Sequence, residues 1–221
     1  MAGEYQDDLY RDKRVRMANR LLEEFNLSLD VFEAMKKVPR HEFVPYERRN
    51  EAYSDIPLPI GEGQTISAPH MVAIMCNLLD LQKGDKVLEV GGGRGYHAAV
   101  VAEIVDKEGK VIAMEIKSEL ARISQETLED LGYYNVRVIT GDGSKGYPPE
   151  SPFDKIYVTA SAPEIPEPLM EQLKPGGKMV IPIGEYMQYL YVVEKDDQGN
   201  INKRNWGGVR FVPLVGEYGV K

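Results

Sequence analysis

A run of glycines follows an apolar segment and is the stretch of this chain best suited to hold a ligand. Residues 87–90 read Val-Leu-Glu-Val, and glycines then stand at positions 91, 92, 93 and 95. Glycines let the backbone approach a ligand closely, and the helix expected over residues 97–105 begins with free N–H groups. A second apolar segment, residues 110–116, carries the acid Glu115 near its end. Strand, glycine turn, helix, strand and acid in this order predict a site for a nucleoside-containing cofactor.

The spacing of the glycines separates two classes of cofactor. A nicotinamide site favours glycine at the first, third and sixth positions of the turn, and here the sixth position is Tyr96. The pattern Gly91-x-Gly93-x-Gly95 instead resembles the first motif of S-adenosylmethionine-dependent methyltransferases. A plain tight turn is the alternative, but the downstream acid favours a cofactor site.

Three expected strand ends would surround such a cofactor, because ligands of doubly wound sheets bind beyond the carboxyl ends of the strands. The N–H groups of the glycine turn suit the methionine half. The Glu115 carboxylate can accept hydrogen bonds from both ribose hydroxyls, and Asp142 can reach the adenine amino group. An exposed acid is the alternative for Glu115, and an ordinary turn is the alternative for residues 141–143. The predicted cofactor-binding residues are Glu89, Gly91, Gly93, Gly95, Glu115, Asp142 and Gly143.

The elements that must position these residues follow from hydrophobic periodicity and from the glycines and prolines between them. Helices are expected over residues 8–24, 29–37, 69–80, 96–105, 118–131 and 166–173. Strands are expected over residues 86–91, 110–116, 136–140, 153–160, 177–183 and 188–195, with a hairpin continuing from Ile201. Residues 209–215 would close the sheet or an added lobe. Alternating strands and helices predict an α/β fold: a doubly wound, mostly parallel, Rossmann-like sheet with N-terminal helices and a C-terminal antiparallel hairpin.

Residues 40–69 are rich in proline and glycine, which predicts a long loop, and their aromatic and apolar side chains indicate that this loop is ordered. We expect a single domain over residues 1–221. Its parts are N-terminal helices with the active-site loop (1–80), a cofactor-binding core (81–184) and C-terminal strands (185–221).

The overall composition limits the possible partners. The net charge of −8 argues against nucleic acids and acidic membranes, which require a dense basic face. Cys76 lies in an apolar run and is expected in the core. His41, His70 and His97 lack metal-ligand spacing, so we expect no metal. The polar N-terminus and the absence of a long apolar run predict a cytoplasmic protein without a membrane segment.

Several motifs, in order along most of the chain, resemble those of the protein-L-isoaspartate (D-aspartate) O-methyltransferase family. The most specific is Thr65-Ile66-Ser67-Ala68-Pro69-His70 within residues 61–71. The others are Arg40-His41-Glu42-Phe43-Val44-Pro45, Gly141-Asp142-Gly143, residues 152–160 with 163–166, and residues 209–214.

The resemblance implies a repair enzyme that moves a methyl group from S-adenosylmethionine to the α-carboxylate of L-isoaspartyl residues in damaged proteins and peptides. By the resemblance, Ser67 corresponds to the active-site serine. A free carboxylate has a pKa near ~4, so the acceptor is already ionised and no general base is required. Neutral donors such as Ser67 and Thr65 suit the orientation of this carboxylate, because a strong fixed charge would stabilise the ground state. Helix capping by Ser67 is the alternative.

The isoaspartyl peptide requires an extended groove, for which residues 56–60 and 209–214 are candidate walls. The predicted substrate-binding residues are Ile66, Ala68, His70, Val212 and Leu214. Residues 209–214 could equally form a core strand. Two other functions stay open: a methyltransferase acting on a small molecule or on RNA, and a catalytically inactive binding module. The sequence leaves the oligomeric state open.

Overall fold

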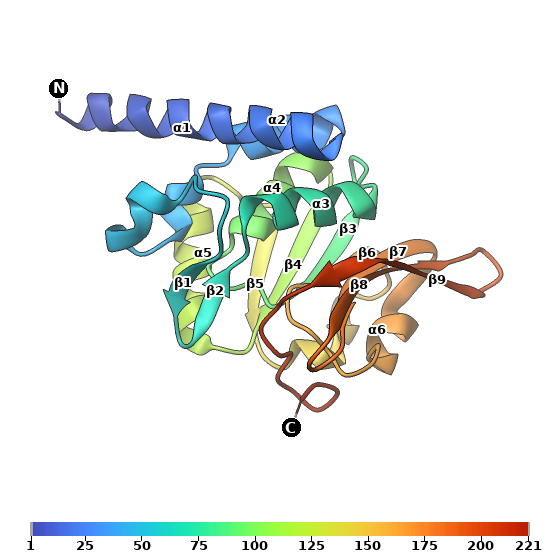
Figure 1. Ribbon diagram of the computed structural model, residues 1–221. Coiled ribbons are helices and arrows are strands. Elements are labelled where there is room, and N and C mark those ends of the chain that lie inside the picture. Colours follow the sequence, from blue (N-terminus) through green and yellow to red (C-terminus); the bar gives the residue numbers. More distant parts are fainter. Residues whose placement is uncertain (1, 221) are drawn as a thin grey trace.

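The structure is a computed structural model that describes residues 2–220, and its centre is a seven-stranded sheet (Figure 1). The strands, in spatial order, are β5 (Val136–Thr140), β4 (Lys110–Glu115), β3 (Lys86–Val90), β6 (Phe153–Val158), β7 (Leu173–Ile183), β8 (Gln188–Lys195) and β9 (Ile201–Val209). The first five of these are parallel, whereas β8 and β9 are antiparallel to their neighbours. The predicted fold class, with its C-terminal antiparallel hairpin, is confirmed.

The strand order reverses at β3. The chain passes from β3 to β4 and β5 on one side and then returns to place β6 on the other side. Such a reversal leaves a crevice beyond the carboxyl ends of the central strands. The glycine turn follows β3 directly, so it lies at this crevice.

Both faces of the sheet are covered. On one face, alternate strand residues such as Val87 and Val111 pack with side chains of α1 (Ala2–Phe25), α2 (Leu29–Lys37), α3 (Pro69–Leu79), α4 (Tyr96–Val105) and α5 (Ser118–Asp130). On the other face, Leu88 and Ile112 pack with Leu169 of the short helix α6 (Glu167–Gln172). This alternation follows from the two-residue period of a strand. Within residues 2–220, no helix combines the length and the apolar character needed to cross a membrane.

The segment predicted as a long loop contains regular structure. Two short 3₁₀ helices, η1 (Arg40–Phe43) and η2 (Tyr46–Glu51), precede a hairpin of β1 (Leu58–Gly61) and β2 (Gln64–Ile66). The hairpin was missed because its strands are short and contain a proline and a glycine, which are depleted in strands. The turn between the strands favours glycine, since Gly61, Glu62 and Gly63 all have positive φ angles.

The expectation for residues 209–215 also needs correction. Strand β9 ends at Val209, and the following residues continue as an irregular segment with two isolated bridges, Pro213 with Ser161 and Val215 with Val220. Ser161 N donates to the carbonyl of Val212, and Leu214 N donates to the carbonyl of Ser161, both at 2.8 Å. The segment is therefore fixed beside the carboxyl end of β6 and does not extend the sheet.

Candidate active site

Two adjoining hollows lie at the carboxyl end of the sheet. The first, which we call the cofactor pocket, is lined by the glycine turn, the end of β4, Gly143 and residues 212–215. The second, which we call the groove, is lined by the loop before α3, the turn between β7 and β8, and residues 208–212. Thr65, Thr159 and Val212 line both. These three residues therefore mark the junction at which two bound molecules could meet.

The glycine turn packs too closely for side chains at two of its positions. A Cβ added to Gly91 would lie 2.4 Å from Oγ1 of Thr159, and one added to Gly95 would lie 2.6 Å from Oγ of Ser124. Both glycines also have a φ of +94°. Glycine is required at both positions because of this conformation and these neighbours.

The amides of the four glycines in the turn are already bonded, although the sequence suggested that they would be free. The amides of Gly91 and Gly92 both donate to the carbonyl of Met114, at 2.8 and 3.0 Å. The amide of Gly93 donates to Glu115, and that of Gly95 donates to the carbonyl of Gly92. A pyrophosphate would need such donors, so this turn is poorly suited to a dinucleotide.

Glu115 stands in the wall of the cofactor pocket as predicted. Its Oε2 accepts a hydrogen bond from the amide of Gly93 at 2.7 Å, and its Oε1 accepts one from the amide of Lys117 at 2.8 Å. Burial raises the pKa of this carboxyl, and the backbone hydrogen bonds oppose that shift. Each carboxylate oxygen has a second lone pair, so Glu115 can still accept hydrogen bonds from two ribose hydroxyls. The residues of the pocket therefore fit S-adenosylmethionine.

The other predicted cofactor residues divide into two groups. Gly91, Gly93 and Gly143 line the pocket with Glu115. Glu89, Gly95 and Asp142 lie outside its lining. Gly95 instead occupies the N-cap position of α4.

Asp142 faces the C-terminal segment. Its Oδ1 accepts from the amide and the hydroxyl of Ser144, and its Oδ2 accepts from the amide of Glu217 at 2.9 Å. These hydrogen bonds hold residues 216–218 beside the pocket, and the contact of Asp142 with the adenine stays a prediction.

Glu89 is fully buried beneath the turn, on the α4 side of β3. Burial raises the pKa of its carboxyl to about 8. The nearby hydroxyl of Tyr157 is also buried, and neither group makes a hydrogen bond of good geometry within the described residues. Glu89 therefore packs against the glycine turn near Gly92.

The groove brings together Thr65, Ser67, Ala68 and His70. The alternative role of Ser67 as a helix cap is wrong, because the N-cap residue of α3 is Ala68 and the side chain that bonds to the first turn, at His70 N, is that of Asp55. The Ser67 side chain is half-buried, that of Thr65 is exposed, and neither hydroxyl bonds to another described residue. Both hydroxyls can therefore serve a ligand.

Three predicted substrate residues have other positions or partners. Ile66 is buried and lines neither hollow, whereas Leu214 lines the cofactor pocket and not the groove. His70 lies in the groove, with its Nδ1 2.9 Å from Oδ1 of Asp55. Of the two candidate walls, Pro57 comes from the first, and the second contributes residues 209–212.

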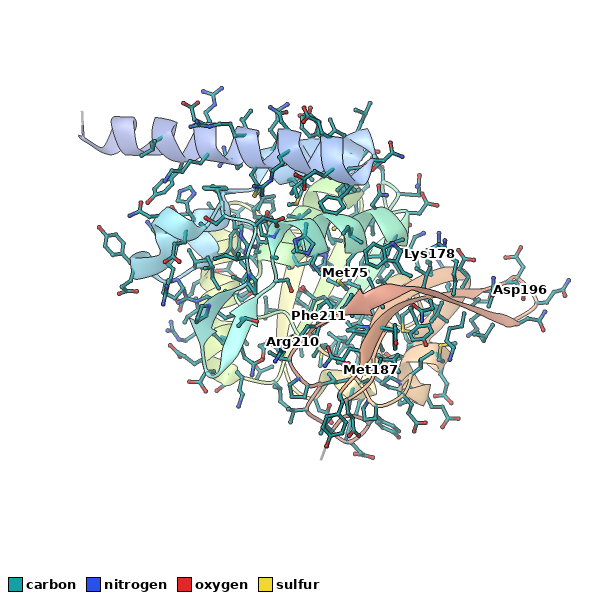
Figure 2. All side chains as sticks on the ribbon, in the orientation of Figure 1. Met75, Lys178, Met187, Asp196, Arg210 and Phe211 are labelled. Atoms are coloured by element: carbon teal, nitrogen blue, oxygen red, sulfur yellow. The ribbon has the colours of Figure 1, made fainter. Side chains whose placement is uncertain are left out.

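Sequence reasoning missed the far wall of the groove. Tyr186 and Met187, in the turn between β7 and β8, are 99% and 71% exposed. The side chain of Gln188 makes two hydrogen bonds to the backbone of Phe211. Its Oε1 accepts one from Phe211 N at 2.6 Å, and its Nε2 donates one to Phe211 O at 3.1 Å. Figure 2 shows Met187, Arg210 and Phe211 near the same end of the β8–β9 hairpin, with Asp196 at the opposite tip. No sequence motif indicated this pairing.

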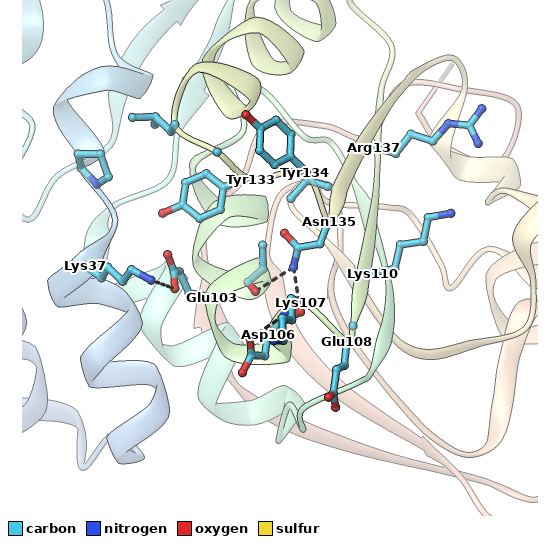
Figure 3. Close-up of a pocket in the computed structure, with 16 residues that line it drawn as sticks. Lys37, Glu103, Asp106, Lys107, Glu108, Lys110, Tyr133, Tyr134, Asn135 and Arg137 are labelled. Atoms are coloured by element: carbon cyan, nitrogen blue, oxygen red, sulfur yellow. Dashed lines mark hydrogen bonds and ion pairs between the residues drawn. The ribbon is translucent and has the colours of Figure 1, made fainter.

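A further cavity lies at the opposite end of the sheet (Figure 3). It is lined by Lys110 and Val136, where β4 and β5 begin, and by Tyr133, Tyr134 and Asn135. Nothing from the glycine turn or the groove reaches it. This cavity is therefore separate from the candidate active site.

The fold and the site define the chain as a methyltransferase that depends on S-adenosylmethionine. More narrowly, it belongs to the protein-L-isoaspartate(D-aspartate) O-methyltransferase family, whose sequence profile matches residues 13–219.

Relatives and solved structures agree with this assignment. The chain is 67% identical over 212 residues to protein-L-isoaspartate O-methyltransferase 2 of Archaeoglobus fulgidus, covering 96% of this chain and 97% of that protein. It is 58% identical over 216 residues to the protein-L-isoaspartate O-methyltransferase of Methanopyrus kandleri, covering 96% of each. A solved protein-L-isoaspartate O-methyltransferase has a TM-score of 0.85 and 32% identity, over 93% of this chain and 67% of that one. Another structure, assigned as such an enzyme from Plasmodium falciparum and bound to S-adenosyl-L-homocysteine, has a TM-score of 0.79 and 31% identity, over 91% and 98%.

Proposed function

We propose that this chain transfers a methyl group from S-adenosylmethionine to the α-carboxylate of L-isoaspartyl residues in proteins and peptides, and that the junction of pocket and groove is where it does so. The observation that carries the proposal is the position of Thr65, which lines the cofactor pocket and the groove together. An acceptor in the groove can approach the pocket at that point.

The cofactor-binding part of the proposal rests on Glu115 and the glycine turn. Glu115 would hold the ribose hydroxyls, and Gly91, Gly93 and Gly143 would leave room for the rest of the molecule. When bound, S-adenosylmethionine supplies a methyl group on a positively charged sulfur, and an oxygen of the acceptor carboxylate takes this methyl group. Residues from all three predicted parts of the chain (Thr65, Glu115 and Val212) line one pocket, which supports the prediction of a single domain.

The acceptor needs orientation and not activation. Its carboxyl has an ordinary pKa near ~4, so it is ionised at neutral pH without a base. The hydroxyls of Ser67 and Thr65 have no partner within the described residues and can donate to it. Neutral donors hold the carboxylate without the strong ground-state stabilisation that a fixed cation would give. Well-oriented reactants can gain about 7–11 kcal/mol from placement alone.

The net charge of −8 also supports a polypeptide and not a nucleic acid as the acceptor, since nucleic-acid binding depends on a dense basic surface. If the acceptor were a small molecule or RNA, neither peptide would be labelled in the test below.

The proposal is tested with two peptides that differ only in carrying isoaspartate or aspartate at one position. The purified chain is incubated with each peptide and with S-adenosylmethionine labelled in its methyl group. We expect base-labile methyl ester on the isoaspartyl peptide alone, and suppression of this signal by excess S-adenosylhomocysteine. Equal labelling of both peptides, or labelling of neither, contradicts the proposal.

A further inference from the structure

Strand β9 is the outer edge of the sheet and is unusually open. Among the strands within residues 2–220, it pairs only with β8 (Figure 1). All of its residues from Ile201 to Trp206 are exposed. An unpaired edge presents backbone N–H and C=O groups that another extended chain can use.

The two halves of β9 differ in character. Lys203 and Arg204, in the half remote from the groove, carry charges of the kind that protect an edge from unwanted pairing. The half nearer the groove, residues 205–209, reads Asn-Trp-Gly-Gly-Val and has no charge. Its last residues, Gly208 and Val209, line the groove itself. The uncharged half of the edge, which has a register shift between Asn205 and Gly207, is thus continuous with the proposed substrate site.

Gly208 has no structural requirement for glycine. A Cβ added there would meet no atom within 4 Å, and its φ lies outside the left-handed region, unlike that of neighbouring Gly207 at +156°. A glycine inside a strand commonly marks a place where a ligand or another backbone approaches closely. At Gly208 the groove side of the strand is open for such an approach.

The charge of this segment suits an isoaspartyl chain. Residues 201–215 include Lys203, Arg204 and Arg210 but no acid, although the whole chain has a net charge of −8. Arg210, which lines the groove, is exposed and forms no ion pair with another described residue. An isoaspartyl residue carries a free carboxylate, so local positive charge favours the approach of the segment that contains it.

We propose that the polypeptide flanking the isoaspartyl residue docks as an extended strand on the outer edge of β9, beginning at Gly208. This inference rests on the proposed function and specifies how that function recognises its substrate. Strand addition takes its affinity from main-chain hydrogen bonds, so it accepts many side-chain sequences. A repair enzyme needs this tolerance, because damaged sites occur in many sequence contexts.

The first experiment replaces single peptide bonds of the isoaspartyl peptide by N-methylated ones. Paired strands alternate between residues that bond to the neighbour and residues that point away. We therefore expect KM to rise at every second position on one side of the isoaspartate, by about five- to tenfold for each lost hydrogen bond. Alanine substitutions of the flanking side chains should change KM far less. Equal sensitivity at successive positions, or none, overturns the docking.

The second experiment changes the edge. The substitution Gly208→Val introduces a side chain that is compatible with a strand but occupies space in the groove. We therefore expect it to raise KM about tenfold. The kcat and the affinity for S-adenosylhomocysteine should stay nearly unchanged. Asn202→Val, on the remote half of β9, is the matched control and should behave as the unchanged chain. An unaltered KM in Gly208→Val contradicts the inference. If the unchanged chain methylates the parent isoaspartyl peptide, the proposed function holds whichever way these tests fall, and failure of that methylation would count against the function itself.

Discussion

The buried guanidinium of Arg40 donates a hydrogen bond to the backbone carbonyl of Ser67 at 2.7 Å. The same side chain donates to the carbonyl of Ala52 at 2.8 Å and lies 4.7 Å from the ring centroid of Tyr96, the first residue of α4. One side chain therefore connects the loop that carries the proposed catalytic hydroxyl to the helix that follows the glycine turn. Arg40 is a positioning residue, since it touches the loop and not the groove.

Replacement of Arg40 by lysine tests this role. Lysine keeps the charge but lacks the planar fork that reaches two carbonyls at once. We expect Arg40→Lys to lower kcat by about ten- to a hundredfold, because small misplacements of reacting groups are costly, while the affinity for S-adenosylhomocysteine changes little. Arg48→Lys, at an exposed arginine paired with Glu51, is the control. An unchanged kcat in Arg40→Lys would show that Arg40 does not position the loop that carries Ser67.

The hydroxyls of Ser67 and Thr65 carry the proposed orientation of the acceptor. Ser67→Ala should reduce kcat about a hundredfold, and Thr65→Val, which keeps the shape, should also reduce it. Ser67→Thr retains a hydroxyl and should recover part of the loss. Cofactor binding, measured by calorimetry with S-adenosylhomocysteine, should persist in Ser67→Ala. Near-normal turnover in Ser67→Ala on an isoaspartyl peptide would end the catalytic assignment of Ser67.

Glu115 makes a different prediction, because it serves the cofactor and not the acceptor. In Glu115→Gln the amide NH₂ would face one of the two backbone N–H groups that the carboxylate now accepts from. We expect the dissociation constant of S-adenosylhomocysteine to rise by about ten- to a hundredfold. Glu119→Gln, at an exposed carboxylate in the first turn of α5, should leave it unchanged. Tight binding by Glu115→Gln would exclude Glu115 as the ribose partner.

Glu89 should make the stability of the fold depend on pH. Burial raises the pKa of its carboxyl to about 8, whereas the unfolded value is near ~4.3. Between these values the folded chain holds a proton that the unfolded chain has lost, so stability falls as pH rises, by up to about 1.4 kcal/mol per pH unit.

The neutral variant Glu89→Gln should lose this dependence. Relative to the unchanged chain it should be equally stable near pH 4 and increasingly more stable towards pH 8, as followed by urea unfolding. Glu171→Gln, at an exposed carboxylate on α6, is the control and should follow the unchanged chain. A parallel pH profile for Glu89→Gln and the unchanged chain would show that Glu89 is ionised in the fold.

The features predicted correctly from the sequence were those encoded locally. Helix α4 and strand β5 begin and end where expected, because their apolar runs are bounded by glycines and polar residues. Glu115 lies at the end of β4, a position that follows from the order of elements alone.

The errors concern contacts between distant parts of the chain. The hydrogen bond that the Asp142 carboxylate accepts from Glu217, 75 residues further along, was not predicted. The role of Arg40 depends on carbonyls 12 and 27 residues away. The N–H groups of Gly91, Gly92 and Gly93 were expected to be free, but they donate to Met114 and Glu115 at the end of β4. Side-chain direction and backbone pairing of this kind have no local sequence signal.

The central claim is that the chain orients an acceptor that is already ionised and supplies no base. The most direct measurement is the single-turnover rate of methyl transfer to an isoaspartyl peptide, with saturating S-adenosylmethionine, between pH 5.5 and 8. We expect a flat profile, because the acceptor carboxyl titrates near ~4, below this range. A rate that rises about tenfold per pH unit within this range would contradict the claim, because it would show that a base takes part in the transfer.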